Sequence, residues 1–261
     1  MRKKRSKKRY PRRGIYVLPN LLTSANLFCG FYAIVAAIQG HFVKGAVAIM
    51  VAAVFDGLDG KIARVTRTVS KFGIEYDSLC DSISFGVAPG ILVYLWILKP
   101  FGRLGWLAAL LFVVCGTLRL ARFNIQVSHV DSDYFTGLPI PAAGFMIAAT
   151  VLLLHRFGGA GTTKQVIILI MMYVLSFLMV STIKYYGFKH PRLFKKMKFN
   201  MLVIVILLSM VIVAEPSLIL FVMMLCYILS GPFTTLWLRK KLRHAEAAAS
   251  NRADSPSQES V

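Results

Sequence analysis

The segment DGLDGKIARVTRTVSKFGIEYDSLCD, residues 56–81, carries four aspartates between strongly apolar stretches of the chain. Asp56 and Asp59 follow one apolar run, and Asp77 and Asp81 precede the next. Only 11 of the 261 residues are acidic, so these four form a concentration. Acidic groups at the edge of membrane-embedded helices carry a high free-energy cost of desolvation, so they usually mark a functional site. The segment therefore predicts two membrane helices with a functional site between them.

The composition indicates a membrane protein, because 57% of the residues are hydrophobic and the mean hydropathy is +0.65. Several apolar runs approach or exceed the ~20 residues that a helix needs to cross a bilayer. The expected fold class is all-α, a polytopic membrane helix bundle of about eight transmembrane helices. The predicted helices cover residues 17–39, 43–59, 76–98, 104–122, 138–155, 165–184, 199–214 and 217–238.

The net charge is +20, and the lysines and arginines lie mainly between the apolar runs. In a soluble protein this charge would suggest nucleic acid, but here it fits topology and anionic lipid, so no nucleic-acid partner is expected. With a cytoplasmic N-terminus and eight crossings, 26 basic residues fall inside and five outside. Because basic loops stay in the cytoplasm, we expect both termini and the aspartate segment at the cytoplasmic face of the cell membrane.

The spacing of the aspartates predicts a metal site. Asp56 and Asp59 are three residues apart and Asp77 and Asp81 are four apart, so each pair lies on one face of its helix. Two antiparallel neighbours could direct four carboxylates to one point. Oxygen ligands suit Mg²⁺ or Mn²⁺. Two such ions can hold a diphosphate and neutralise charge as a phosphoryl bond breaks.

A structural alternative is that the first pair of aspartates caps a helix and the second pair forms ion pairs with Arg64 and Arg67. Four aspartates at matched helical spacing, with Gly57, Gly60 and Gly73 between them, favour the metal site. Arg64 could instead contact a phosphate group.

The same residues resemble the signature of the CDP-alcohol phosphotransferase family. The matching pattern is Asp56-x2-Asp59-Gly60-x2-Ala63-Arg64-x8-Gly73-x3-Asp77-x3-Asp81. The resemblance implies transfer of a phosphatidyl or similar group from a CDP-linked donor to an alcohol, with release of CMP. It implies that the four aspartates bind two divalent cations, Mn²⁺ or Mg²⁺, that Asp81 is also the base for the acceptor hydroxyl, and that the enzyme is a homodimer.

The resemblance also implies a nucleotide and diphosphate site on the first helix and beside the aspartates. Its residues would be Pro19, Asn20, Thr23, Gly60, Ala63, Arg64 and Ser70. For Asn20, a role as a helix N-cap remains an alternative.

Three further segments resemble the phosphatidylserine synthase branch of that family, namely SISFGVAP at 82–89, LRLARFN at 118–124 and FTGLPIP at 135–141. This resemblance implies CDP-diacylglycerol as donor and L-serine as acceptor. An arginine fork binds a carboxylate, so Arg119 and Arg122 could hold that of serine, and Asn124 its amino group. Alternatively, both arginines only mark a helix end, or the acceptor is glycerol phosphate, inositol phosphate or choline.

The chain divides into four parts on this reading. Residues 1–16 form a basic cytoplasmic arm that either attracts anionic headgroups or only fixes topology. Residues 17–184 are expected to form the catalytic bundle of about six helices. Residues 185–244 would form a basic, lipid-facing loop and two C-terminal transmembrane helices. The polar tail at residues 245–261 is expected to be disordered.

Two other classes of function compete with the enzyme. A divalent-cation carrier should offer acidic groups deep in the membrane with access from both faces, whereas these aspartates form one cluster at one face. A structural scaffold that binds anionic lipid would leave the four aspartates without a role.

Overall fold

The computed structural model describes residues 17–66, 70–127, 134–158, 162–186 and 215–253. Its helices are α1 (Val17–Ile38), α2 (Phe42–Val65), α3 (Lys71–Asp81), a π-helical segment (Ser82–Val87), α4 (Ala88–Val93), a second π-helical segment (Tyr94–Leu98), a 3-10 turn (Lys99–Phe101), α5 (Arg103–Val127), α6 (Ile140–Arg156), α7 (Thr162–Val180) and α9 (Pro216–Ala253). The strands are β1 (Tyr134–Thr136) and β2 (Lys184–Tyr186). The predicted helical class is confirmed, and the one departure is this short antiparallel ribbon, which pairs Phe135 with Tyr185.

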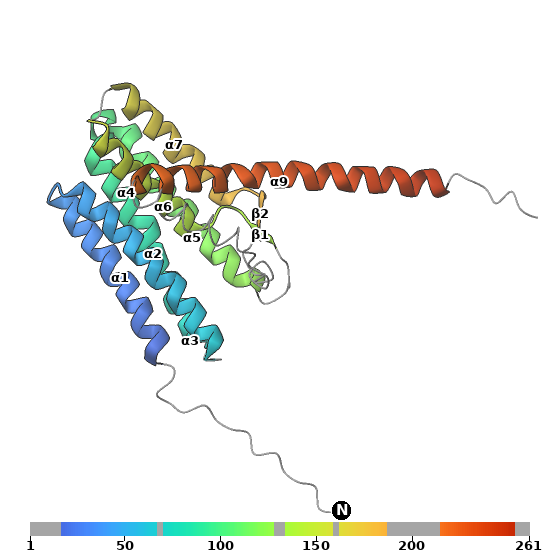
Figure 1. Cartoon of the computed structure of the whole chain (residues 1–261), viewed down its shortest axis with the longest axis horizontal. Helices are drawn as coiled ribbons and strands as arrows, with labels where there is room; N and C mark the ends of the chain where they lie inside the picture. Colours follow the sequence, from blue (N-terminus) through green and yellow to red (C-terminus); the bar gives the residue numbers. More distant parts are fainter. Residues whose placement is uncertain (1–16, 67–69, 128–133, 159–161, 187–214, 254–261) are drawn as a thin grey trace, which may run out of the picture.

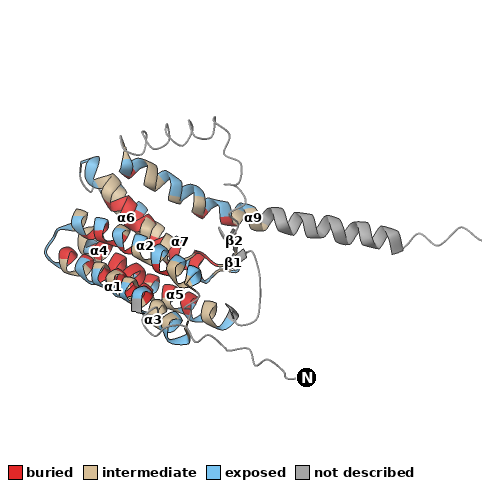
Figure 2. Ribbon diagram, turned by 60° about the horizontal axis from the view of Figure 1, so that its bottom comes forward, coloured by how far each residue is buried: buried red, intermediate tan, exposed pale blue. Residues whose placement is uncertain are grey.

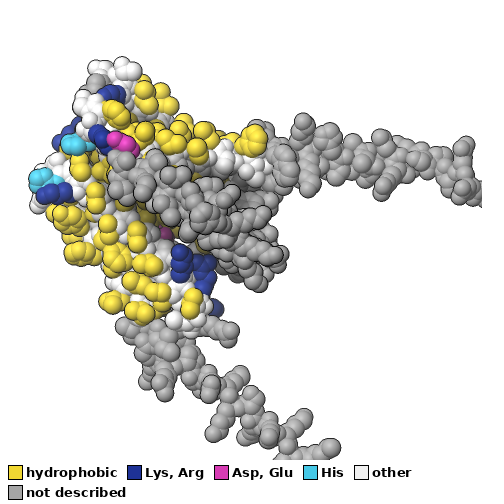
Figure 3. Space-filling model, in the orientation of Figure 1, with side chains coloured by type: hydrophobic (Ala, Val, Ile, Leu, Met, Phe, Trp, Pro, Cys, Tyr) yellow, Lys and Arg dark blue, Asp and Glu magenta, His cyan; other side chains and the backbone are white. Residues whose placement is uncertain are grey.

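Five helices in the described ranges are long and apolar enough to cross a membrane. They are Leu18–Ile38, Lys71–Phe101, Arg103–Ile125, Thr162–Val180 and Pro216–Thr235. Helix α6 is also apolar but shorter, and the helix predicted at 199–214 lies outside the described residues. On the face drawn in Figure 3, hydrophobic side chains cover much of the surface and basic side chains gather towards its ends. This distribution fits a bundle surrounded by lipid.

Several helix boundaries differ from the sequence prediction; for example, α5 runs on to Val127 and α7 already ends at Val180. Helix α2 continues past Asp59 to Val65, through good helix formers such as Ala63. Helix α3 begins at Lys71, because the Ser70 hydroxyl caps it by accepting a hydrogen bond from the Gly73 amide at 3.0 Å. The polar tail predicted from residue 245 is helical as far as residue 253, where alanines favour the helix.

Helices α1 and α2 form an antiparallel hairpin (Figure 1). Gly40, with φ of +78°, ends α1, and the following amide of His41 donates to the Ala36 carbonyl at 2.8 Å. Buried alanines such as Ala33 and Ala46 line the contact. Small side chains let two membrane helices approach closely, so this hairpin brings the end of α2 that carries the aspartates beside the start of α1.

The helical path from residue 71 to residue 101 is the most buried of the five candidate membrane spans, and Figure 2 shows many buried residues around its segment α4. Its first departure from α-helical geometry is the π-helical segment that starts immediately after Asp81. Phe85 in this segment is fully buried and packs against Gly144 of α6. Such π-helical turns occur frequently at functional sites, and this one fixes how the helix enters the core.

We expect Gly144→Ala to destabilise the protein. A β-carbon at Gly144 would lie 2.9 Å from the carbonyl oxygen of Phe85 and 3.1 Å from its Cα, so backbone must move. Overpacking of this kind costs about 1–3 kcal/mol. Thermal unfolding in detergent measures the effect, with Gly57→Ala as control because nothing lies within 4 Å of its new β-carbon. Equal midpoints for the two variants would contradict the close contact.

Candidate active site

Three carboxylates meet between α2 and α3. Asp56 and Asp59 from α2 and Asp77 from α3 each offer one oxygen, and these oxygens lie within 4.8 Å of one another. Because α2 continues as a helix past Asp59, its two aspartates stay one turn apart on the face that meets α3. The helical spacing predicted that four carboxylates would meet at one point, and the structure brings three of them together.

Asp81 lies one turn further along α3 than Asp77 and is buried. It does not belong to the group of three oxygens, although the charges of Asp56 and Asp77 act on it. Asn26 of α1 donates a hydrogen bond from Nδ2 to Asp81 Oδ1 at 2.9 Å. The fourth aspartate thus occupies a deeper position beside α1.

Helix α1 supplies polar partners to both aspartate pairs. The Thr23 hydroxyl lies 2.8 Å from Asp59 Oδ2 and 3.1 Å from the carbonyl oxygen of Pro19. Thr23 and Asn26 are three residues apart and share one face of the helix. The sequence analysis missed Asn26. The sequence does contain a signal for it, namely an amide one turn from Thr23 on a mostly apolar helix.

The carboxylates fit a hard divalent cation. Asp77 Oδ1 is buried without a hydrogen-bond partner, and the charge of Asp77 adds to those of Asp56 and Asp59. Among the described residues the only salt bridge joins Arg156 to Glu215, far along the chain from this cluster. A cation bound by these oxygens would remove both the repulsion and the unsatisfied oxygen.

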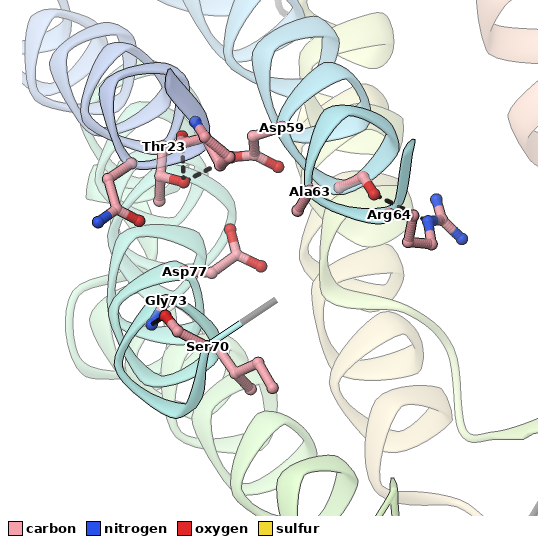
Figure 4. A pocket seen from close by; sticks show the side chains of 11 residues that line it. Thr23, Asp59, Ala63, Arg64, Ser70, Gly73 and Asp77 are labelled. Carbon is pink, nitrogen blue, oxygen red and sulfur yellow. Dashed lines mark hydrogen bonds between the residues drawn. The ribbon is translucent and has the colours of Figure 1, made fainter. Parts of the chain in front are cut away.

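The structural alternative of ion pairs is wrong for Arg64. Its Nε donates to the Gly60 carbonyl at 2.8 Å, and the side chain extends away from Asp59 and Asp77 (Figure 4). Arg67, the other arginine of that alternative, lies outside the described residues.

A pocket opens beside the carboxylates, between α1, α2 and the start of α3 (Figure 4). All seven residues predicted for the nucleotide and diphosphate line it, together with Asp59 and Asp77. Gly73 and Ile74 also line it, and a β-carbon at Gly73 would press on the Ser70 hydroxyl at 3.1 Å. At Gly60 the nearest atom to such a β-carbon is 3.9 Å away, so space remains for a ligand. The pocket therefore joins the predicted nucleotide residues to the acidic cluster.

Arg119 of α5 is buried near the deeper aspartate. Its guanidinium lies over the Phe123 ring, 5.3 Å from the centroid, and its Nε has no hydrogen-bond partner. It interacts electrostatically with Asp81 and with Tyr227 of α9. A buried cation with an unused donor, close to a carboxylate, is suited to a second anionic group.

The two other residues predicted for the acceptor point elsewhere. Arg122 reaches the carbonyl of Val180 with Nη1 at 3.5 Å. Asn124 donates from Nδ2 to Ser78 Oγ at 3.0 Å and to Glu75 Oε2 at 3.3 Å. Because Arg122 bonds to α7 and Asn124 to α3, the three predicted acceptor residues do not converge on one point.

Comparisons with known proteins fit this geometry. A family model described as CDP-alcohol phosphatidyltransferase matches residues 16–179. The chain is 39% identical over 231 residues to a CDP-diacylglycerol–serine O-phosphatidyltransferase of Helicobacter pylori, covering 87% of this chain and 94% of that protein. It is 32% identical over 242 residues to the enzyme of the same name from Mycobacterium leprae, covering 89% and 79%. It is also 38% identical over 170 residues to an archaetidylserine synthase of Methanothermobacter thermautotrophicus, covering 64% and 69%.

We expect Asp77→Asn to weaken Mn²⁺ binding about tenfold or more, because a hard cation loses one anionic ligand. Titration of the purified protein in detergent, with free Mn²⁺ followed by electron paramagnetic resonance, measures the affinity. The control is Glu75→Gln, which removes a nearby acid on the same helix whose carboxylate bonds to Asn124 instead. Equal Mn²⁺ affinities for both variants would sink the assignment of Asp77 as a ligand.

Proposed function

The chain belongs to the CDP-alcohol phosphatidyltransferase family, and from that premise we propose that it makes phosphatidylserine from CDP-diacylglycerol and L-serine. The hydroxyl oxygen of serine bonds to the phosphorus that carries the diacylglycerol. The bond from that phosphorus to the bridging oxygen of the diphosphate breaks, and CMP leaves. The observation that carries this proposal is the pocket that joins the predicted nucleotide residues to the acidic cluster.

The residues that would bind the CDP-diacylglycerol donor lie on α1 and α2 and at the start of α3. The cytidine nucleotide would lie along the pocket between Asn20, Gly60 and Ser70, with its diphosphate towards Asp59 and Asp77. The four aspartates would hold two Mg²⁺ or Mn²⁺ ions, which neutralise the charge of the diphosphate when bound. The diacylglycerol tails would remain in lipid between apolar helices.

Asp81 is the base of the proposed reaction. A carboxylate is too weak a base to ionise an alcohol beforehand, so it takes the hydroxyl proton as the new bond forms. The buried position of Asp81, behind the three clustered carboxylates, supports this separate role.

Arg119 would bind the carboxylate of serine. It is buried, keeps Nε unpaired and interacts electrostatically with Asp81, so an acceptor between the two would expose its hydroxyl to the base. Arg122 and Asn124 belong to this site only if their contacts with α7 and α3 rearrange.

The proposal also includes the place of the enzyme in the cell. The distribution of basic residues supports both termini and the active site at the cytoplasmic face of the cell membrane, in a bundle of eight crossings. The basic arm, the basic loop and a homodimer remain predictions, because the arm and most of the loop lie outside the described residues.

We expect purified protein in detergent to release CMP from CDP-diacylglycerol when L-serine and Mn²⁺ or Mg²⁺ are present. A chelator should abolish the release because the diphosphate charge is then unneutralised. Glycerol phosphate, inositol phosphate and choline are supplied one at a time as competing acceptors. Release with one of them, and none with serine, would reject the serine assignment while leaving the family chemistry intact.

Asp81→Asn should abolish turnover with serine, because an amide cannot take the proton. Its partner contact is kept, since an asparagine at this position still presents an oxygen to Asn26. A CMP release rate equal to that of the wild type would reject Asp81 as the base. A thermal unfolding midpoint in detergent close to that of the wild type would show that the variant is folded.

Arg119→Leu should raise the KM for serine by about 30-fold or more, the typical cost of removing one partner of a buried charged pair. The KM for CDP-diacylglycerol should not change, because Arg119 does not line the nucleotide pocket. Arg122→Leu is the matched control on the same helix. If Arg119→Leu has the wild-type KM for serine, Arg119 does not bind the acceptor.

A further inference from the structure

Asn26 occupies an unusual position for an amide. Its side chain is fully buried on α1 and contacts Asp81, while its backbone carbonyl contacts Ser84 one turn after Asp81. Nδ2 donates to Asp81 Oδ1 at 2.9 Å, whereas Oδ1 of the amide is buried without a partner. Ser84 Oγ donates to the backbone carbonyl of Asn26 at 3.1 Å.

The chemistry of the pair fixes which way the amide faces. An ionised carboxylate only accepts hydrogen bonds, so the NH₂ group of Asn26 must be the end that meets Asp81. The bond occupies Oδ1 of Asp81 and leaves Oδ2 for other partners. The orientation of the carboxylate is therefore set from α1, a helix that carries none of the aspartates.

The packing around Asn26 keeps the amide in this place. A β-carbon at Gly30, one turn further along α1, would lie 2.7 Å from Ser84 Cα, so α1 and the π-helical segment are in close contact. That segment begins at Ser82, directly after Asp81. A fully buried side chain at such a close contact between helices has little room to change rotamer.

A buried amide with only one of its two polar groups hydrogen-bonded destabilises the folded state. Its unpaired carbonyl oxygen has lost its hydrogen bonds to water and gained none in the protein. An apolar side chain of similar size would fill the same space at no such cost. The amide is better explained by what it does to Asp81 than by packing.

We propose that Asn26 is a positioning residue for the transfer reaction, which holds one oxygen of Asp81 so that the other faces the acceptor hydroxyl. This inference rests on the proposed function, because it takes Asp81 as the base. It predicts an effect on the chemical step and none on donor binding, since Asn26 does not line the nucleotide pocket.

The test uses two variants without a donor, Asn26→Ala and Asn26→Leu, of which only the alanine leaves a large cavity, because leucine has nearly the size and shape of asparagine. We expect both variants to lower kcat about 10- to 100-fold, as removal of groups that orient a reactive ligand commonly does. The KM for CDP-diacylglycerol should stay at the wild-type value, because Asn26 does not line the nucleotide pocket.

Each other outcome has a definite meaning. A kcat for Asn26→Leu equal to that of the wild type would overturn the inference, because a loss confined to Asn26→Ala would come from the cavity and not from the lost donor. A loss confined to the donor KM would also overturn it. If Asn26→Ala does not fold, Asn26→Leu alone decides.

Failure of the proposed function is a separate result. It would appear as a wild-type enzyme that does not use serine, in which case the variants are compared with the acceptor that the wild type does use.

Discussion

The dominant physical constraint in this protein is the repulsion and desolvation of carboxylates that apolar helices force together. Asp56, Asp59 and Asp77 present oxygens within 4.8 Å of one another, and Asp81 adds a buried fourth charge. No described lysine or arginine forms a salt bridge with them. The fold must therefore stabilise these buried carboxylates with neutral hydrogen-bond donors, with a bound cation or with both. Much of the architecture around α1, α2 and α3 follows from this requirement.

Helix α1 meets part of the requirement. It carries no acidic residue, yet it offers a hydroxyl to Asp59 and an amide to Asp81 from one face. These donors are effective only if α1 lies very close to both neighbours, and small residues provide that closeness. Buried alanines line the contact with α2, and Gly30 permits the contact with the π-helical segment. The close packing of α1 against its neighbours thus also brings its donors within hydrogen-bond distance of Asp59 and Asp81.

Helical periodicity alone predicted that the aspartates of α2 and α3 would come together, because their positions follow from counting turns. The seven nucleotide residues, all of which line the pocket, were predicted from the resemblance to the family and not from periodicity. The sequence could not place Arg122 or Asn124, because their partners on α7 and α3 depend on how distant helices pack. The β1–β2 ribbon was missed for the same reason, since its strands are three residues long and pair across two helices. Asn26 was missed because its role depends on a contact with Asp81, 55 residues away.

The donor and acceptor sides also draw on different parts of the chain. Every residue of the nucleotide pocket lies within residues 16–179, the span that matches the family model. Arg119 lies within it too, but its electrostatic neighbour Tyr227 belongs to α9, beyond that span. Tyr227 packs against Tyr185 of β2 with ring centroids 5.8 Å apart, and a side chain at Gly231 would collide with the Tyr185 ring. The acceptor site that we propose at Arg119 is therefore influenced by a segment beyond the span that the family model matches. Such a division would let the acceptor site vary while the carboxylate cluster stays fixed.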